Sequence, residues 1–160
     1  MPSVPRPDAR SDERRLAASR AGIGFALLNV PLGAVAVAAD WRTTVDAPLN
    51  QGPAAESFLL RGTALSGPVP PVVLTGALGL LARRHDRWGL AATGLLGAMG
   101  LFITINGARQ ALARPAAHSP RPVLVAGGAI FTALGLRLTA ASGRALAAHR
   151  DSAAHAGQTP

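Results

Sequence analysis

The stretch Trp88 to Asn106, WGLAATGLLGAMGLFITIN, decides the fold class of this chain. It contains no ionisable side chain, and Arg87 and Arg109 lie just beyond its two ends. At 1.5 Å of rise per residue, a helix of this length covers the roughly 30 Å hydrocarbon core of a bilayer. The sequence therefore predicts a transmembrane helix, with residues 88–109 as one membrane span.

Small residues recur about four apart along this stretch, at Gly89, Thr93, Gly97, Gly100 and Thr104. Such residues allow the backbones of two membrane helices to approach closely. We therefore expect the face that carries Gly97, near the middle of the span, to lie against another helix.

A short charged turn, residues 83–87, precedes this span. A connection of this length makes the two helices that it joins antiparallel and adjacent. The preceding span is therefore the expected neighbour of Gly97, and it offers the small residues Thr75, Gly76 and Gly79.

The first apolar run, Ala21 to Ala39, predicts a span over residues 20–40. An alternative is a cleaved secretory signal, because Arg14 and Arg15 precede the run and Ala36 and Ala38 form an A-x-A site. A run of roughly nineteen residues is long for the apolar part of a signal. Because further apolar segments also follow, we favour a membrane span.

Two further spans are expected over residues 57–84 and 122–143. Within the earlier of these, Pro68, Pro70 and Pro71 each remove a backbone donor and obstruct the preceding helical turn. We expect these prolines to divide the span, either with a bend of more than about 20° or as two helices that meet there.

The fold class predicted is all-α: an integral membrane protein, with residues 20–143 forming a four-helix transmembrane bundle whose second span is interrupted by proline. Residues 1–19 are expected to be a mobile tail and residues 144–160 a second tail. Of the 160 residues, 49% are hydrophobic and 15% charged, which is too apolar for a typical soluble domain when the apolar residues lie in blocks.

The chain has no cysteine, which excludes thiolate chemistry, disulfides and iron–sulfur ligation.

The arginines predict the orientation, because cytoplasmic loops are enriched in basic residues. With the amino terminus inside, eleven arginines lie on the inner side and five on the outer side. The inner set is Arg6, Arg10, Arg14, Arg15, Arg20, Arg83, Arg84, Arg87, Arg137, Arg144 and Arg150, and the outer set is Arg42, Arg61, Arg109, Arg114 and Arg121. We predict a multi-pass protein of the cell membrane with both termini cytoplasmic, and contact between anionic lipid headgroups and the inner face.

Reactive side chains are missing from the interior of the predicted spans: Asp40 ends the first span, and no other Asp, Glu or His lies within any of them. This pattern argues against proton-coupled transport and against axial ligation of haem within the membrane. His149, Asp151 and His155 have a spacing compatible with metal binding, but in a terminal tail we expect them to be solvated. The sequence therefore predicts no catalytic residue, no metal site and no cofactor.

A few polar residues are candidates for binding. Asn29 lies two residues before Pro31 in the first span, and we expect it to hold the bundle together by hydrogen bonds; a ligand contact is the alternative. At the outer end of the bundle, the expected outcome is an arginine–carboxylate pair that holds the loop after the first span over the helices, and the alternative is a small polar pocket. The residues involved there are Asn106, Arg109, Asp40, Asp46 and Glu56.

Two classes of function fit this pattern. The first is a non-catalytic membrane protein, either an accessory subunit or a small permease-like bundle. The second is a membrane enzyme that acts on a lipid or quinone at the outer face, which requires the carboxylates to converge on one cavity. The expected partners are the lipid bilayer and either further copies of the chain or another membrane protein. We expect no nucleic acid partner.

Overall fold

The computed structural model describes residues 9–43, 53–113 and 119–156, and this part of the chain is all-α. Its helices are α1 (Ala9–Ala38), α2 (Ala54–Leu60), α3 (Val69–Leu81), α4 (Arg87–Leu112) and α5 (Arg121–Ala156). Helices α1, α4 and α5 are long and apolar enough to cross a membrane, whereas α3 is a shorter apolar helix. The prediction of an all-α fold is confirmed for the described residues, and the predicted spans are matched by three helices that could cross a membrane.

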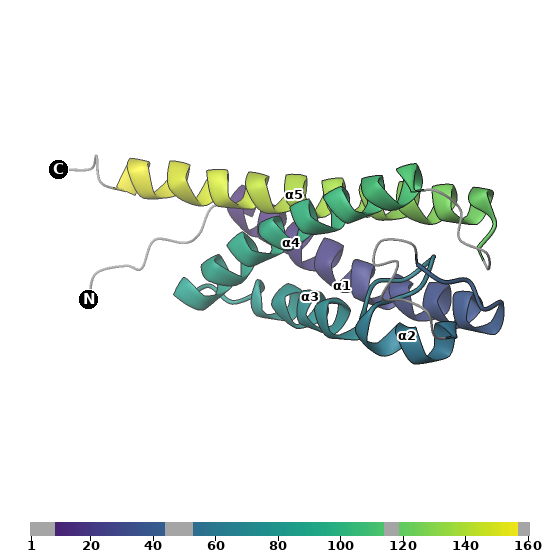
Figure 1. Ribbon diagram of the computed structural model, residues 1–160. Coiled ribbons are helices and arrows are strands. Elements are labelled where there is room, and N and C mark those ends of the chain that lie inside the picture. Colours follow the sequence, from purple (N-terminus) through teal and green to yellow (C-terminus); the bar gives the residue numbers. More distant parts are fainter. Residues whose placement is uncertain (1–8, 44–52, 114–118, 157–160) are drawn as a thin grey trace.

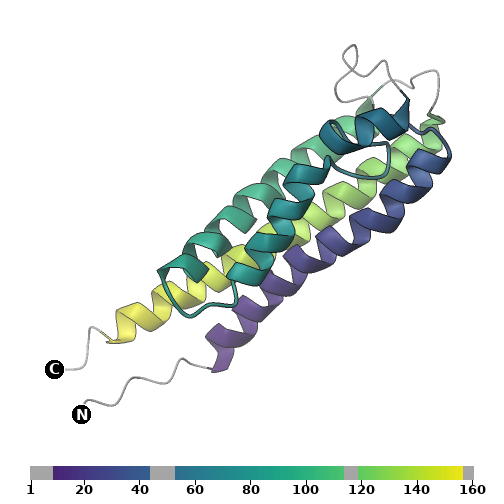
Figure 2. The same ribbon diagram turned by 90° about the horizontal axis from the view of Figure 1, so that it is seen from below.

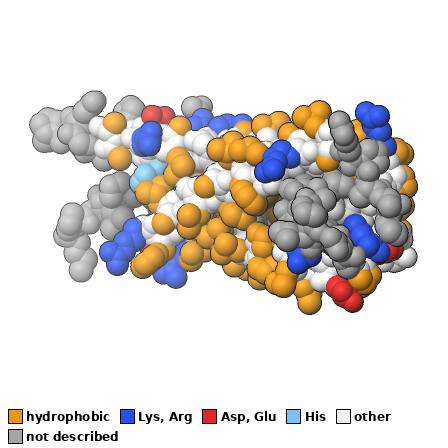
Figure 3. Space-filling model, viewed as in Figure 1, with side chains coloured by type: hydrophobic (Ala, Val, Ile, Leu, Met, Phe, Trp, Pro, Cys, Tyr) orange, Lys and Arg blue, Asp and Glu red, His pale blue; other side chains and the backbone are white. Residues whose placement is uncertain are grey.

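The long helices lie side by side in an elongated bundle (Figures 1 and 2). Helix α1 begins and helix α5 ends at the same end of the bundle, which we call the terminal end. The opposite end, formed by residues 39–43, 53–68 and 119–120, is called the distal end. Apolar side chains cover much of the middle of the face shown in Figure 3, and acidic side chains lie toward the two ends of the bundle. This distribution suits a body whose middle is surrounded by lipid.

Helices α4 and α5 pack with their backbones in close contact. A Cβ atom built on Gly100 would lie 2.7 Å from the backbone nitrogen of Thr139 and 2.8 Å from the carbonyl oxygen of Gly135. About two turns further along α4, a Cβ on Gly107 would lie 2.6 Å from the backbone nitrogen of Thr132 on α5. These distances are too short for any side chain, so the glycines are what allow the two helices to approach.

Gly97 does lie toward a neighbouring helix, but that helix is α5, where a Cβ would make an ordinary 3.4 Å contact with Ser142. The expected pairing with the small residues of the preceding helix is therefore wrong. In α3, Gly76 and Gly79 face α1: a Cβ on Gly79 would lie 3.0 Å from the backbone of Ser19. The turn places α3 next to α4 in the chain, but the close backbone contact of α3 is with α1.

Residues 57–84, the expected second span, do not form one continuous helix. Helix α2 ends at Leu60, and α3 begins at Val69 with Pro68 as its N-cap residue. Pro70 and Pro71 lie in the first turn of α3, where a missing backbone N–H costs no intrahelical hydrogen bond. The prolines therefore mark the start of a helix, and non-helical backbone separates that start from α2.

The outermost helices continue beyond the apolar runs. Helix α1 begins at Ala9, inside the range 1–19 expected to be a tail, while residues 1–8 lie outside the described part. Helix α5 continues to Ala156, well beyond residue 143. Both helices therefore extend past the length that a bilayer core requires.

At the terminal end, the turn between α3 and α4 is fixed by Asp86. Its side chain caps α4 by accepting hydrogen bonds from the backbone nitrogens of Trp88 and Gly89, at 3.1 and 3.0 Å. The hydrogen bond from Gly89, together with the neighbouring Arg84, lowers the pKa of Asp86 below its ordinary value. Arg15 of α1 donates to the carbonyl oxygen of Arg84 at 3.0 Å, so the turn is also attached to α1.

Candidate functional site

At the distal end, the chain that leaves α1 joins the segment that leads into α3. Arg42 and Thr63 form an isolated antiparallel bridge, and the nitrogen of Ala64 donates to the carbonyl oxygen of Trp41 at 3.1 Å. The hydroxyl of Ser119 accepts from the nitrogen of Arg42 and donates to its carbonyl oxygen, both at 2.8 Å. These bonds connect three chain segments that are distant in sequence, so the distal end has a defined structure.

Gln110 attaches α4 to this layer. Its side chain is only 4% exposed, and its amide nitrogen donates to the carbonyl oxygen of Ala64. Its amide oxygen accepts from the hydroxyl of Thr43 at 3.5 Å. A Cβ on Gly127 of α5 would overlap the carbonyl oxygen of Ala64, so only glycine leaves room for this contact.

Sequence reasoning did not single out Gln110. The signal for it was weak: an uncharged amide one turn beyond Asn106, at the end of an apolar run, looks the same whether it faces water or the protein. Its role depends on non-helical backbone from another part of the chain, which periodicity does not reveal.

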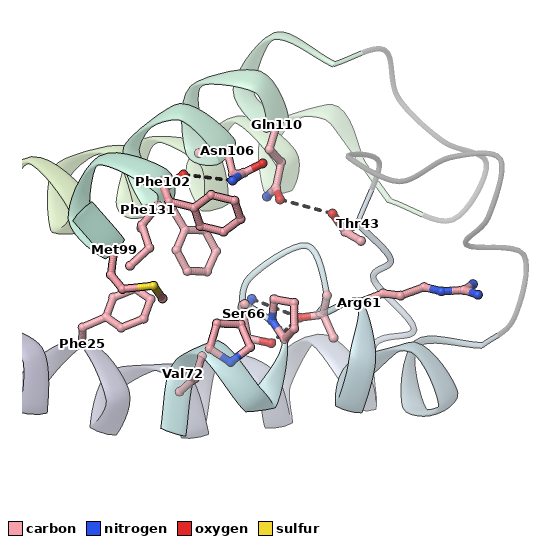
Figure 4. A pocket seen from close by; sticks show the side chains of 16 residues that line it. Phe25, Thr43, Arg61, Ser66, Val72, Met99, Phe102, Asn106, Gln110 and Phe131 are labelled. Carbon is pink, nitrogen blue, oxygen red and sulfur yellow. Dashed lines mark hydrogen bonds between the residues drawn. The ribbon is translucent and has the colours of Figure 1, made fainter. Parts of the chain in front are cut away.

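A cavity of about 170 Å³ lies beneath this layer, between α3 and α4 (Figure 4). One part is apolar and aromatic, with the side chains of Phe25, Met99 and Phe131 close together. The other part is polar and contains Gln110 and Thr43. The full lining is Phe25, Thr43, Arg61, Thr63, Ser66, Gly67, Pro68, Pro71, Val72, Met99, Phe102, Ile103, Asn106, Gly107, Gln110 and Phe131.

The cavity follows from where α3 begins. Toward the terminal end, Leu78 and Ala82 of α3 pack in one buried cluster with Leu96 of α4. Toward the distal end, α3 has not yet started, and residues 61–68 supply irregular backbone in place of helical side chains. Side-chain packing between α3 and α4 is therefore complete at one end and open at the other.

Asn29, the candidate in the first span, is 3% exposed and bonded at both ends of its amide. Its nitrogen donates to the carbonyl oxygen of Phe25 at 2.8 Å, and its oxygen accepts from the nitrogen of Gly67 at 2.9 Å. The side chain therefore connects α1 to the segment before α3, and it does not line the cavity.

The candidates at the distal end do not gather at one point. Asp40 is paired with Arg42 at 2.7 Å, and it also accepts from the backbone nitrogen of Ala54 at 2.7 Å, which fixes the start of α2. The hydrogen bond to Asp40 raises the pKa of Arg42 above its ordinary value. This ion pair lies within one short segment after α1, and the hydrogen bond from Ala54 is what connects Asp40 to α2.

The expected arginine, Arg109, is exposed and forms no ion pair with a described residue, and the same is true of Glu56. Asn106 is the one member of the predicted distal set that lines the cavity, where its amide nitrogen donates to the carbonyl oxygen of Phe102 at 2.9 Å. Asp46 lies outside the described residues. Within residues 9–43, 53–113 and 119–156, the predicted carboxylates do not converge on one cavity.

Five threonine hydroxyls of α3, α4 and α5 bond within their own helices, whereas the buried hydroxyl of Ser142 on α5 has no hydrogen-bond partner among the described residues. Each threonine side chain donates to the carbonyl oxygen four residues earlier, with oxygen–oxygen distances from 2.7 to 3.0 Å. The residues are Thr75, Thr93, Thr104, Thr132 and Thr139. These bonds satisfy the hydroxyl groups in an apolar medium and leave none of them aligned with a base.

A second hollow, of about 540 Å³, lies at the terminal end and contains Asp12, Arg15, His85 and His149. It shares no lining residue with the cavity at the distal end. In the described part of the chain, no three His, Cys, Asp or Glu side chains are grouped so that they could hold a metal ion. The side chain of His155 lies outside the described residues.

No protein-family model, curated protein or solved structure matches this chain.

Proposed function

We propose that this chain is a non-catalytic accessory subunit of a membrane protein complex, held in the cell membrane by four crossings with both termini cytoplasmic. Three crossings are α1, α4 and α5. The fourth is formed by α2, residues 61–68 and α3 together, because α3 alone covers only about 20 Å of the roughly 30 Å hydrocarbon core.

The observation that carries the proposal is that the polar side chains named below, within the apolar helices, form hydrogen bonds with backbone atoms. Their threonine hydroxyls bond to their own helix backbone, and Asn29 bonds to two backbone groups. No described Asp, Glu or His lies within these apolar segments. An interior of this kind supports packing between helices and offers no acid, base or nucleophile.

A permease-like role has less support. Between the distal cavity and the terminal hollow, the bundle is filled by Ala92, Leu96 and Leu138, each at most 1% exposed. The enzymatic alternative is also less favoured, since Asp40 is engaged by Arg42 and Glu56 does not line the cavity. An accessory role requires neither a path through the bundle nor a reactive site.

The proposal is tested by determining what the chain is bound to in its own membrane. The full chain, tagged at its carboxyl terminus, is purified in a mild detergent after cross-linking in intact membranes, and the stoichiometry of the complex is measured by mass spectrometry. We expect a second integral membrane protein at a fixed ratio to the chain. Recovery of the chain as a monomer, or with copies of itself alone, would contradict an accessory role.

A further inference from the structure

The cavity between α3 and α4 has the shape and chemistry of a site for one amphiphile. We propose that it binds a single anionic glycerophospholipid from the bilayer, with the part of one acyl chain next to its ester in the apolar part and the phosphate near Arg61. This inference rests on the proposed placement of the helices in a membrane.

The apolar part is large enough for a hydrocarbon group. Apolar cavities of about 150 Å³ in proteins bind benzene, and the whole cavity, its polar part included, measures about 170 Å³, so the apolar part has room for a segment of fewer than about eight carbon atoms. Its walls include Phe25 and Phe131, whose rings contact edge to face with their centroids 6.2 Å apart. Both rings are buried, at 4% and 7% exposure, and so belong to the inner wall of the cavity.

The cavity opens toward the surroundings of the bundle. Phe102, a lining residue on α4, is 57% exposed, and the lining residues Pro71 and Val72 on α3 are half-buried. In a bilayer this opening between α3 and α4 would face lipid chains. A lipid tail can therefore enter from the side, without crossing the polar distal layer.

The polar part supplies the recognition of a headgroup. Arg61 lines the cavity and is exposed, and its guanidinium extends away from the cavity toward the distal end (Figure 4). No described carboxylate lies within ion-pair distance of it, whereas the nearby Arg42 is paired with Asp40. At headgroup level, a guanidinium that no described carboxylate neutralises attracts an anionic lipid.

Asn106 supplies a hydrogen-bond donor between the apolar part of the cavity and Arg61, at the level of the lipid's ester groups. One of its two amide N–H groups bonds to the carbonyl oxygen of Phe102, which leaves the second available at the cavity wall. A phospholipid carries ester carbonyl oxygens at this level, and these accept hydrogen bonds. Along the cavity, the apolar wall is followed by the amide donor of Asn106 and then by Arg61, which has no carboxylate partner among the described residues. This order matches the order of groups along one phospholipid.

The test uses the full chain in nanodiscs that contain a phosphatidylglycerol with a photoreactive diazirine within about the first eight carbons of one acyl chain, counted from the ester. After illumination, the labelled residues are mapped by mass spectrometry. We expect labels on Phe25 and Phe131, which bulk lipid does not reach, as well as on lipid-facing residues such as Leu95 and Leu101. Labels on the lipid-facing residues alone would overturn the lipid site, whereas no label on any of these residues would count against the membrane placement itself.

Two variants make the test specific. Met99→Trp fills the cavity and should abolish labelling of Phe25 and Phe131, while the matched control Leu101→Trp, on the exposed face of the same helix, should not. With a phosphatidylcholine probe we expect about fivefold weaker labelling of the two rings, and Arg61→Gln should remove this difference. Equal labelling by both probes in the unmodified chain would overturn the role of Arg61.

Discussion

The two sides of helix α4 are packed by different means. On the side of α5, glycines let the two backbones touch over several turns, and no space remains for a side chain at Gly100 or Gly107. On the side of α3, side chains fill the terminal half and a cavity occupies the distal half. In a bilayer, where the lipid tails are as apolar as the helices, we expect close backbone contact to supply the stability, and the looser side is where we propose a ligand.

The strongest test of this comparison is Gly100→Leu. The atoms that meet the new side chain include backbone atoms of α5, which cannot move aside without separating the helices. We expect a loss of unfolding free energy of about 3 kcal/mol, measured by reversible unfolding in mixed detergent.

The control for Gly100 is Gly94→Leu on the same helix, because a Cβ on Gly94 would meet nothing within 4 Å. This control should unfold like the unmodified chain. Equal losses in the two variants would show that the glycines of α4 reflect composition and do not form an interface.

Gln110→Leu removes the connection between α4 and the distal layer. It leaves the carbonyl oxygen of Ala64 without the amide donor that Gln110 provides. We expect a loss of about 2 kcal/mol in the same unfolding experiment, the cost of a buried polar group without its partner. The matched change Asn106→Leu, one turn earlier, should cost less than about 0.5 kcal/mol, because that amide bonds only within its own helix and is partly exposed. A larger loss at Asn106 than at Gln110 would reverse this assignment.

Gly97→Leu tests how much space is left at the edge of the α4–α5 interface. The Cβ position has ordinary space against Ser142, so only the outer carbons of leucine must be accommodated. We expect a loss of about 1 kcal/mol, and none for Ala91→Leu on the exposed side of α4. The order Gly100, Gly97, Gly94 then measures how the backbone contact weakens around the helix, and a different order would contradict it.

The smallest expected effect concerns Asp86 at the turn between α3 and α4. Its pKa is lowered in the folded chain, so its charge stabilises the fold above the unfolded pKa of about 3.9, and this contribution is lost as pH falls through the lower folded value. Asp86→Asn keeps the cap acceptor but removes the charge. Between pH 6 and pH 3 we expect the Tm of the unmodified chain to fall slightly further than that of the variant, and parallel curves would show that the charge contributes nothing.

Much of the helical architecture could be predicted from the sequence, because membrane helices are recognised by the length of uncharged runs. The runs around Phe25 and Gly97 and the one after Pro122 each lie in a helix that the sequence predicts. Small residues also indicated close helix contacts, and Gly100 makes one. Their partner could not be predicted, since a short turn makes α3 and α4 neighbours but does not determine which faces touch.

The candidate site was less predictable. Asn29 was identified because a polar residue beside a proline in an apolar run needs hydrogen bonds, and it has them. Gln110, Ser119 and Thr63 were missed, because their partners are backbone atoms of irregular segments whose path has no periodic signal. The pairing of Asp40 with Arg42 in place of Arg109 likewise depends on the chain reversal after α1, where Asp40 takes a positive φ of 49°.

The measurement that tests the central claim most directly is the membrane topology. The chain has no cysteine, so single cysteines at Gly52, His85, His118 and Gln158 can be labelled in intact cells with a membrane-impermeant maleimide without background. With four crossings and both termini inside, Gly52→Cys and His118→Cys are labelled from outside, and His85→Cys and Gln158→Cys only after permeabilisation. Labelling of His85→Cys and Gln158→Cys from outside, with His118→Cys protected, would mean that α2 and α3 do not cross, and would contradict the account.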